Sequence, residues 1–350
     1  MPAGDEIVER VGSFAREQRL LGPRDRLVLA VSGGPDSVCM LHVLAGVLRD
    51  ARSRLVVVHV DHGFRLDSAS DAEFVRALAA QFGLACEVAR VDGPSFSRRH
   101  GLGIEHAGRA LRYQALARAA ARHRARAAAT AHTLDDSIES LVMHLLRGAG
   151  PEGLGGIAPD EVLELARLGP LAMADLPDSL RVVRPLLGIR RTGTVGYCSE
   201  RGLEWRSDPT NDDPAFLRNR VRNHLLPILR TYNPGIEATL ARTAAVIRAE
   251  SAWLDELMTS RWRRLARGYG TQRLELPLEA WRRQPLAVQR RLLRRALAAL
   301  GADDDGSGFE TIERAVQFAS ADRPRRIQLA RGVTLRRAGD TITLAREGDR

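Results

Sequence analysis

The sequence predicts an α/β protein with a doubly wound parallel sheet, followed by a mainly helical C-terminal domain that ends in a β-hairpin. Short apolar runs alternate with segments of helical periodicity over the first half of the chain. These runs are almost continuously apolar, as expected for parallel strands that helices cover on both faces. Beyond residue 235 apolar residues recur every three or four positions, until two short runs close the chain.

The expected elements follow in chain order. The first part is expected to contain helices at 5–20, 68–82, 103–124 and 134–145, a helix that begins near residue 38, and strands at 26–31, 54–60, 84–91 and 127–130. Further along we expect a strand at 182–187, helices at 190–201, 216–223 and 235–300, and a hairpin over 327–344. Residues 158–181 have weak patterning and receive no assignment.

Composition sets broad limits. A chain of 350 residues can hold two or three domains. We place a catalytic domain at residues 1–213 and a helical substrate-specificity domain at 214–350, because residues 208–214 have the composition of a loop. No apolar run approaches the ~20 residues of a membrane span, and the N-terminus does not resemble a signal peptide. Cys39, Cys86 and Cys198 are isolated, which predicts no thiolate metal site or cluster and a cytoplasmic protein.

The basic charge is carried by arginine alone. The formal net charge is +10, and the chain contains no lysine. A biased genome composition explains most of these positions simply. Arginine forks nevertheless bind phosphate bidentately, so the charge also indicates a polyanionic partner such as nucleic acid.

A glycine-rich turn follows the first expected strand and precedes a helix. Such a turn directs backbone N–H groups and the positive end of the helix dipole at an anion. An ordinary strand-to-helix turn has a similar composition, but the strand–turn–helix context favours phosphate binding. The candidate residues are Ser32, Gly33, Gly34, Pro35, Asp36 and Ser37.

Polar residues also follow two other strands. Asp61 and His62 lie at the carboxyl end of the second strand, as candidate nucleotide contacts or simply as part of a polar loop. His132 follows the fourth strand, with Asp136 and Glu139 in the first turn of the next helix. Capping by Thr133 explains one or two of the acids in this turn. Together these groups favour Mg²⁺ and an amine substrate.

Several arginines are candidates for phosphate or RNA binding. Each has a simpler interpretation as a solvated side chain or an ion-pair partner, as for Arg109 with Glu105 four residues before it. The candidates are Arg109 and Arg112 in the helix at 103–124, Arg147 before a glycine-rich segment, Arg191 in the helix at 190–201, and Arg218, Arg220 and Arg222 in the helix at 216–223.

The turn at 32–37 resembles the PP-loop of the N-type ATP pyrophosphatases, which cleave ATP to AMP and diphosphate. With it, six other segments make the chain resemble the bacterial tRNA(Ile)-lysidine synthetases. These segments are residues 60–65, 107–113, 130–139, 146–157, 184–187 and 208–222.

The resemblance implies the activity and its partners. The family adenylates O2 of the wobble cytidine in a CAU-anticodon tRNA(Ile), and free L-lysine then displaces AMP to give lysidine. ATP is therefore a substrate, with Mg²⁺; no membrane is involved, and a homodimer is compatible with the family.

The resemblance also implies roles for particular residues. The implied catalytic residues are Asp36, His132, Asp136, Glu139 and Arg112. ATP would be bound by residues 32–37 with Asp61 and His62, Mg²⁺ by Asp36 and Glu139, and tRNA by Arg109, Arg147, Arg191, Arg218, Arg220 and Arg222.

Some features depart from the family pattern. Thr133 and Ser137 stand where the family often has His and Gln. Residues 158–181 form a longer connection than the family usually has, and the chain ends after one C-terminal domain, as in the short forms of the family. The alternatives are a PP-loop tRNA 2-thiolation enzyme, which needs catalytic or cluster-binding cysteines, and a non-catalytic RNA-binding protein with a degenerate nucleotide site.

Overall fold

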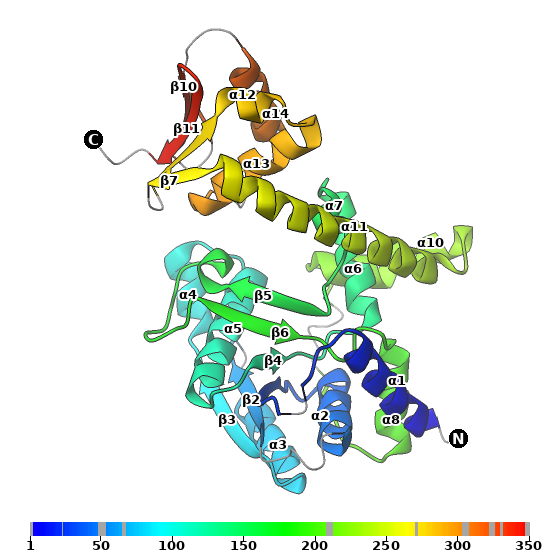
Figure 1. The fold of residues 1–350 in the computed structure, drawn as a ribbon. Helices are drawn as coiled ribbons and strands as arrows, with labels where there is room; N and C mark the ends of the chain where they lie inside the picture. Colours follow the sequence, from blue (N-terminus) through cyan, green and yellow to red (C-terminus); the bar gives the residue numbers. More distant parts are fainter. Residues whose placement is uncertain are drawn as a thin grey trace. The chain divides into compact units, whose positions relative to one another are not determined.

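The computed structural model divides into two compact units, Met1–Arg248 and Ala249–Arg350 (Figure 1). It describes residues 3–22, 24–47, 54–64, 68–207, 213–269, 272–302, 308–321, 326–329 and 332–346. Arg65 and the expected hinge residues 208–212 therefore lie outside the described residues. None of the described helices combines the length and the apolar character needed to cross a bilayer.

The first unit is built on a six-stranded sheet with the order β3-β2-β1-β4-β6-β5. Its strands are β1 (Leu27–Ala30), β2 (Leu55–Asp61), β3 (Ala85–Arg90), β4 (Ala127–Ala129), β5 (Asp160–Glu164) and β6 (Ser179–Val183). All neighbouring pairs are parallel except β5 and β6, which are antiparallel. The predicted doubly wound sheet is thus confirmed, with one antiparallel strand added at its edge.

Helices cover both faces of this sheet. They are α1 (Ala3–Glu17), α2 (Pro35–Val47), α3 (Ser68–Gln81), α4 (Gly93–His100), α5 (Ile104–Arg122), α6 (Leu134–Leu146), α7 (Pro151–Leu154) and α8 (Arg191–Glu200). Leu27 and Leu29 of β1 pack in the cluster that contains α1, α2, α3 and α8 residues, whereas Val28 packs in the cluster of α5. This alternation explains why the strand is apolar at every position.

A helical extension completes the first unit. It comprises α9 (Leu217–Arg220), the π-helical turn η4 (Val221–Leu225), α10 (Leu226–Tyr232) and the first part of α11 (Ile236–Leu265). Val221 and Leu226 are buried in one cluster with Ile138 and Leu141 of α6. The first compact unit therefore extends through this shared core to Arg248, within α11.

The second unit combines helices with a five-stranded antiparallel sheet of order β7-β8-β11-β10-β9. Its further elements are β7 (Arg267–Tyr269), β8 (Arg273–Pro277), α12 (Leu278–Arg282), α13 (Leu286–Ala299), α14 (Phe309–Ser320), β9 (Arg326–Gln328), β10 (Val333–Ala338) and β11 (Thr341–Arg346). The predicted terminal hairpin is β10 and β11. Continuous helix over 235–300 is wrong, because β7 and β8 interrupt it and β8 pairs with β11.

One other expectation in the first unit is also corrected, and one unassigned segment is now described. The strand expected at 182–187 is β6, which ends at Val183, because the Arg184 N–H bonds to the Pro159 carbonyl and the chain then turns. The unassigned residues 158–181 contain β5 and a 3₁₀ turn, η2 (Leu165–Leu168).

Candidate active site

The loop between β1 and α2 has the shape of an anion-binding turn. Gly33 has a φ of +93°, which L side chains rarely adopt, and its N–H donates to the Ser37 hydroxyl at 3.1 Å. That hydroxyl donates to the Gly34 carbonyl at 2.9 Å. Because α2 begins at Pro35, its unpaired N–H groups and positive dipole end belong to this loop. The loop can therefore bind a phosphate group.

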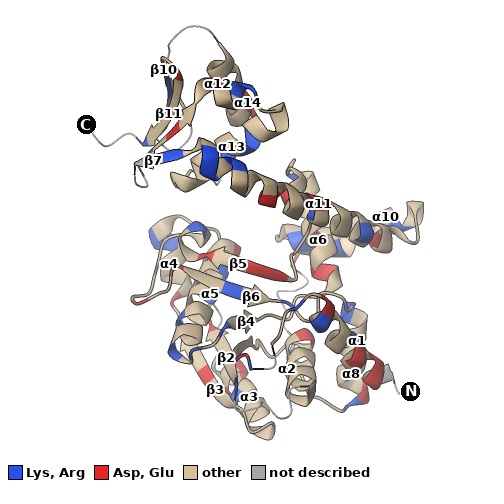
Figure 2. Cartoon of the chain, viewed as in Figure 1, with Lys and Arg blue, Asp and Glu red and all other residues tan. Residues whose placement is uncertain are grey.

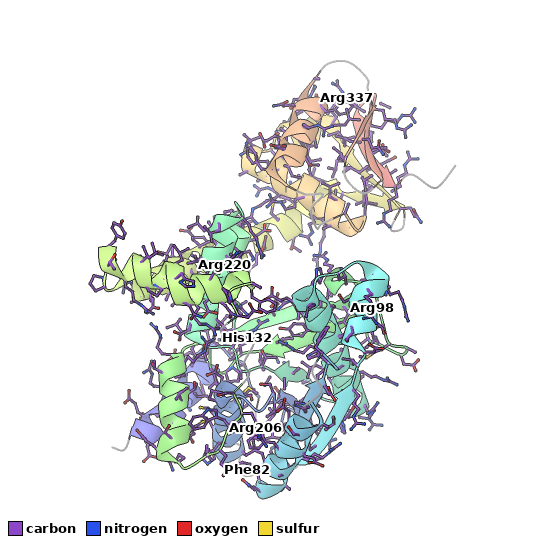
Figure 3. The ribbon with its side chains drawn as sticks, turned by 180° about the vertical axis from the view of Figure 1, so that it is seen from behind. Phe82, Arg98, His132, Arg206, Arg220 and Arg337 are labelled. Atoms are coloured by element: carbon purple, nitrogen blue, oxygen red, sulfur yellow. The ribbon has the colours of Figure 1, made fainter. Side chains whose placement is uncertain are left out.

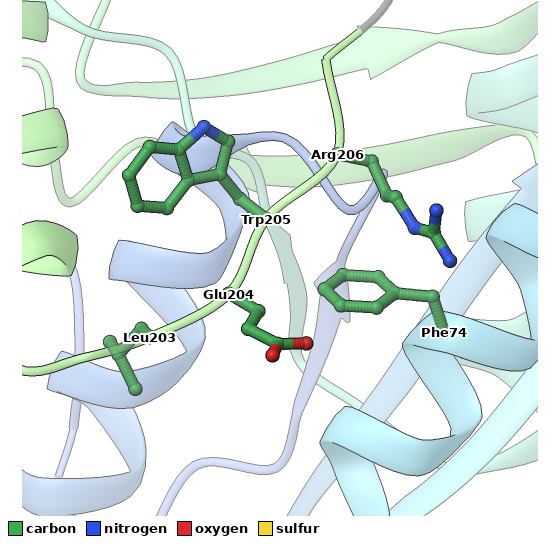
Figure 4. A pocket seen from close by; sticks show the side chains of 5 residues that line it. All are labelled: Phe74, Leu203, Glu204, Trp205 and Arg206. Atoms are coloured by element: carbon green, nitrogen blue, oxygen red, sulfur yellow. The ribbon is translucent and has the colours of Figure 1, made fainter.

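A segment from beyond α8 contacts the same loop. The Arg206 N–H donates to the Gly33 carbonyl at 2.9 Å, and the Arg206 guanidinium lies 5.3 Å from the centre of the Phe74 ring. Phe74 and residues 203–206 line a cavity of about 470 Å³ (Figure 4). A Cβ atom on Gly33 would lie 3.4 Å from Phe74, so this cavity adjoins the loop.

Arg191 gathers carboxylates from two helices around one guanidinium. Its Nη2 lies 2.7 Å from Asp136 Oδ1, its Nη1 lies 3.2 Å from Glu139 Oε1, and its Nε lies 3.4 Å from Asp36 Oδ2. Asp36 belongs to α2, and the two other acids belong to α6. The arrangement places the phosphate loop next to Asp136 and Glu139, the acids that the sequence analysis predicts to bind an amine substrate.

Glu139 is the most enclosed member of this carboxylate cluster. Its side chain is 1% exposed, and both of its oxygens accept hydrogen bonds from Arg222, at 2.7 and 3.1 Å. Arg218 Nε lies 3.4 Å from Glu139 Oε2. Three of the arginines predicted to bind tRNA, Arg191, Arg218 and Arg222, therefore contact carboxylates, and their tRNA role stays a prediction.

Asp36 is held by a hydroxyl as well as by a guanidinium. The Thr194 hydroxyl donates to Asp36 Oδ1. Burial raises the pKa of Asp36 above its ordinary value, although the Thr194 hydrogen bond and the charge of Arg191 oppose this shift. Among the three acids around Arg191, Asp36 has the longest contact to the guanidinium.

The start of α6 serves two purposes. Asp136 Oδ2 accepts the Thr133 N–H at 2.7 Å and the Thr133 hydroxyl at 2.9 Å, so this oxygen caps the helix. The other oxygen, Oδ1, binds Arg191. Burial disfavours ionised Asp136, but Arg191, His132 and the Thr133 N–H outweigh it and lower its pKa.

His132 is a neutral imidazole next to this capped aspartate. Burial lowers the pKa of His132, and the charge of Asp136 only partly opposes this effect. Nearby arginines, among them Arg184 and Arg112, lower it further. The His132 ring Nδ1 lies 2.9 Å from the Thr130 hydroxyl. A neutral imidazole at this position can accept a proton.

The glycine-rich segment after α6 docks on that helix. The Ser137 hydroxyl accepts the Ile157 N–H at 3.2 Å. Gly156 has a φ of +66°, and a Cβ atom there would lie 2.6 Å from the Ser137 hydroxyl. The close contact between the two segments therefore depends on both the small side chain at 137 and the glycine at 156.

Asp61 and His62 stand apart from the carboxylate cluster. Asp61 Oδ1 accepts the Gly63 N–H at 3.1 Å, which makes a local turn at the end of β2. The pKa of His62 is lowered to about 4, mainly by burial and then by the charge of Arg112. Its Nδ1 atom has no hydrogen-bond partner among the described residues. The charge of Arg112 lowers the pKa of both His62 and His132.

The remaining candidate arginines are exposed. Arg109 lies over the ring of Tyr113, 4.9 Å from its centre. Arg147 ends α6, and Arg220 lies on α9 (Figure 3). These three exposed side chains can contact a phosphate, whereas the guanidinium of Arg222 is bound to Glu139.

Two residues with clear roles were not singled out in the sequence. Thr194 binds Asp36, and Arg190 bonds to Asp135 at 3.2 Å and to Glu237 at 2.8 Å. The signal for Arg190 was its place beside Arg191 at a helix start, whereas nothing local marks Thr194.

Comparisons with known proteins identify the families that this chain resembles. Residues 6–229 match the model of a family described as "PP-loop domain", and residues 276–343 match "TilS substrate binding domain". The U34-tRNA thiolase NcsA from Methanococcus maripaludis has the same fold, with a TM-score of 0.54 and 15% identity over 70% of this chain and 80% of its own.

Curated relatives cover most of the chain. A tRNA(Ile)-lysidine synthase from Dehalococcoides mccartyi is 37% identical over 92% of this chain and 67% of its own length. One from Bacillus thuringiensis subsp. konkukian is 32% identical over 82% of this chain and 58% of its own. The chain thus spans between about three fifths and two thirds of these relatives.

Proposed function

Because this chain belongs to the tRNA(Ile)-lysidine synthase family, we propose that it joins L-lysine to the wobble cytidine of a CAU-anticodon tRNA(Ile). ATP adenylates the base and releases diphosphate, and the lysine amine then displaces AMP. The observation that carries this proposal is the contact of Arg191 with both Asp36 and Glu139. An ATP loop and an acidic cation site are thereby adjacent, as a reaction between an activated base and an amine requires.

The loop at residues 32–37 stabilises the leaving diphosphate. Its backbone N–H groups and the N-terminus of α2 are fixed by the Ser37 hydrogen bonds before substrate arrives. Preorganised donors of this kind stabilise charge that develops in a transition state without reorganising.

The acids of α6 select the amine. Asp136 and Glu139 are paired with the Arg191 guanidinium, so an ammonium group would bind these acids by taking the place of that cation. The ammonium must lose a proton before it attacks, and the candidate bases are a carboxylate of the cluster and His132. Burial lowers the pKa of His132 and so weakens it as a base.

The two expected Mg²⁺ ligands differ in how well they fit. Mg²⁺ needs only one or two protein carboxylates when phosphate oxygens and water complete its shell. Among the described residues, no three acids, histidines or cysteines form a complete metal site. Both oxygens of Glu139 accept from Arg222, whereas Asp36 Oδ2 has only the 3.4 Å contact to Arg191. We therefore assign Mg²⁺ to Asp36, where the ion would neutralise phosphate charge.

The 2-thiolation alternative lacks a suitable cysteine. Cys39 and Cys198 are buried, and burial raises the pKa of both thiols. Thiolate chemistry needs the opposite shift. The likeness to NcsA at 15% identity concerns the fold alone.

The second unit is proposed to bind the tRNA, because residues 276–343 match a substrate-binding model. A cytoplasmic location follows from the tRNA and ATP substrates. The homodimer is a separate proposal, which light scattering of the free protein tests directly.

Labelled lysine tests the reaction. The protein is incubated with CAU-anticodon tRNA(Ile), ATP and labelled lysine, and the label in tRNA is counted together with AMP and diphosphate. We expect equal amounts of all three products and none when the wobble cytidine is replaced by uridine. Nucleotide-dependent tRNA binding without label would instead support the non-catalytic RNA-binding alternative.

A further inference from the structure

The segment that sequence patterning left unassigned, residues 158–181, is fastened to α5 by one buried side chain. Gln114 is fully buried, its Nε2 donates to the Pro170 carbonyl at 2.9 Å, and its Oε1 accepts the Ala172 N–H at 2.8 Å. His106 adds a contact of 3.1 Å to the Leu168 carbonyl. The Gln114 side-chain amide thus holds the loop at residues 170–172 through both its nitrogen and its oxygen.

This fastened loop forms one wall of a pocket of about 270 Å³. Ala172 and Met173 lie on this wall, and the apolar side chains of Phe96 and Leu111 lie deeper, each at most 5% exposed. The pocket therefore has an apolar base and belongs to a part of the chain that no step of the proposed reaction uses.

Arginines from three different elements line the same pocket. They are Arg90 at the end of β3, Arg99 on α4 and Arg118 on α5. Figure 2 shows basic segments around α4, and Figure 3 labels the neighbouring Arg98. In the described part of the chain, Arg99 and Arg118 form no ion pair within 4.0 Å, and Arg90 has one contact of that length, to Asp61.

Among the described residues that line the pocket, one carboxylate, Asp92, stands against three arginines, and its charge interacts with that of Arg99. Asp92 is the N-cap of α4, and its Oδ1 accepts the Ser95 N–H at 2.9 Å. By contrast, two arginines further along the chain, at the end of α5 and just before β4, are paired: Arg122 lies 2.6 Å from Glu87, and Arg126 lies 3.1 Å from Asp25.

We propose that the pocket between α4, α5 and the loop at 169–173 binds one nucleotide of the tRNA. Arg99 and Arg118 would contact its phosphate and Arg90 the neighbouring one, while the base would enter the apolar part. This proposal rests on the proposed function for the identity of the RNA.

The pocket suits a piece of a polymer better than a free nucleotide. Its volume lies below the ~300–1,000 Å³ of sites that enclose a whole small ligand. Its arginines are exposed, as Arg90 is at 70%, so a chain can continue past the mouth in both directions. Arginine with an aromatic or apolar surface is the usual chemistry for an unstacked RNA base and its phosphate.

A matched pair of double variants tests the proposal in the full chain. Arg99→Gln with Arg118→Gln removes two pocket charges, and Arg122→Gln with Arg126→Gln removes two paired charges outside the pocket. We expect the first variant to lose roughly tenfold or more in tRNA affinity, and its salt dependence to fall by about 0.7 for each lost phosphate contact. The control should stay within about twofold of the unmodified protein, and only the pocket variant should raise KM for tRNA.

A third variant separates the loop from the charge. Gln114→Met keeps every arginine but removes both hydrogen bonds that hold residues 170–172. We expect weaker tRNA binding with an unchanged salt slope. Thermal unfolding of all variants identifies any general loss of structure.

Three outcomes would overturn the inference. The pocket variant could bind tRNA like the control, Gln114→Met could leave tRNA affinity unchanged in a folded protein, or the pocket variant could lose affinity for ATP or inorganic phosphate instead of tRNA. A failure of the unmodified protein to incorporate lysine would overturn the proposed function, while tRNA binding would still report on the pocket.

Discussion

Replacing Arg222 by alanine should destabilise the first unit, because Glu139 would lose both of its shortest hydrogen bonds. Glu139 is 1% exposed, and Arg222 donates to its two oxygens at 2.7 and 3.1 Å. A hydrogen bond to a charged group contributes about 1.5–3 kcal/mol. Arg191 and Arg218 remain at 3.2 and 3.4 Å, so the lower end applies, or about 3 kcal/mol in total.

Thermal unfolding measures this loss. For a unit of this size, 1 kcal/mol corresponds to about 2–4 °C in Tm, so Arg222→Ala should lower Tm by about 6–12 °C. Arg220→Ala is the matched control, since this exposed arginine lies on the adjoining helical turn and should change Tm little. Adding Glu139→Gln to Arg222→Ala should recover part of the loss, because the buried charge is then gone.

The same variants distinguish a carboxylate partner from a tRNA ligand. If Arg222 contacts a phosphate, its replacement should leave Tm unchanged and reduce the slope of tRNA affinity against salt by about one. That combination of results would refute the reasoning from the Glu139 geometry.

Three further predictions follow from the phosphate loop and its surroundings. Asp36→Asn should abolish lysine incorporation while tRNA binding persists, as measured by label counting and a binding titration; near-normal turnover would remove Asp36 from the catalytic assignment. Gly33→Ala should cost about 1–2 kcal/mol in unfolding free energy, because φ is +93° there and the new methyl group would approach Phe74, and it should weaken ATP binding. Burial lowers the pKa of His62 to about 4, below its ordinary value of 6.5, so the unfolded chain binds the extra proton between these values. The free energy of unfolding is therefore not reduced by His62 above pH 6.5, and it falls as the pH decreases toward 4, with a slope of at most about 1.4 kcal/mol per pH unit. His62→Gln should reduce this slope in denaturant titrations at different pH values. An unchanged slope would show that His62 titrates normally.

Local patterns predicted the parallel sheet well. Continuous apolar runs such as β2 have few alternatives to a covered strand, and residues 32–37 combine a strand end, glycines and a helix start. The antiparallel edge strand β5 escaped notice, since its exposed residues lack a continuous run. The strands β7 and β8 were missed because they are short and acquire their partner, β11, from far along the chain.

The partners of the charged residues could not be predicted in the same way. Capping by Thr133 and Asp136 is local and visible in the sequence. The contacts of Arg191 with Asp36 and of Arg222 with Glu139 depend on how α2, α6, α8 and η4 are packed together. Sequence alone therefore identified Arg191 and Arg222 as cations of interest without identifying the acids that they contact.

The contacts of the phosphate loop with Thr194 of α8 and with Arg206 beyond it have a consequence for synthesis of the chain. The loop is made early, but its Asp36 is bound by Thr194, 158 residues later, and its Gly33 carbonyl is bound by Arg206. A nascent chain that ends before residue 194 contains a complete β1–α2 turn without either partner. The Asp36 carboxylate and the Gly33 carbonyl therefore gain these two partners only after residues 194 and 206 have left the ribosome.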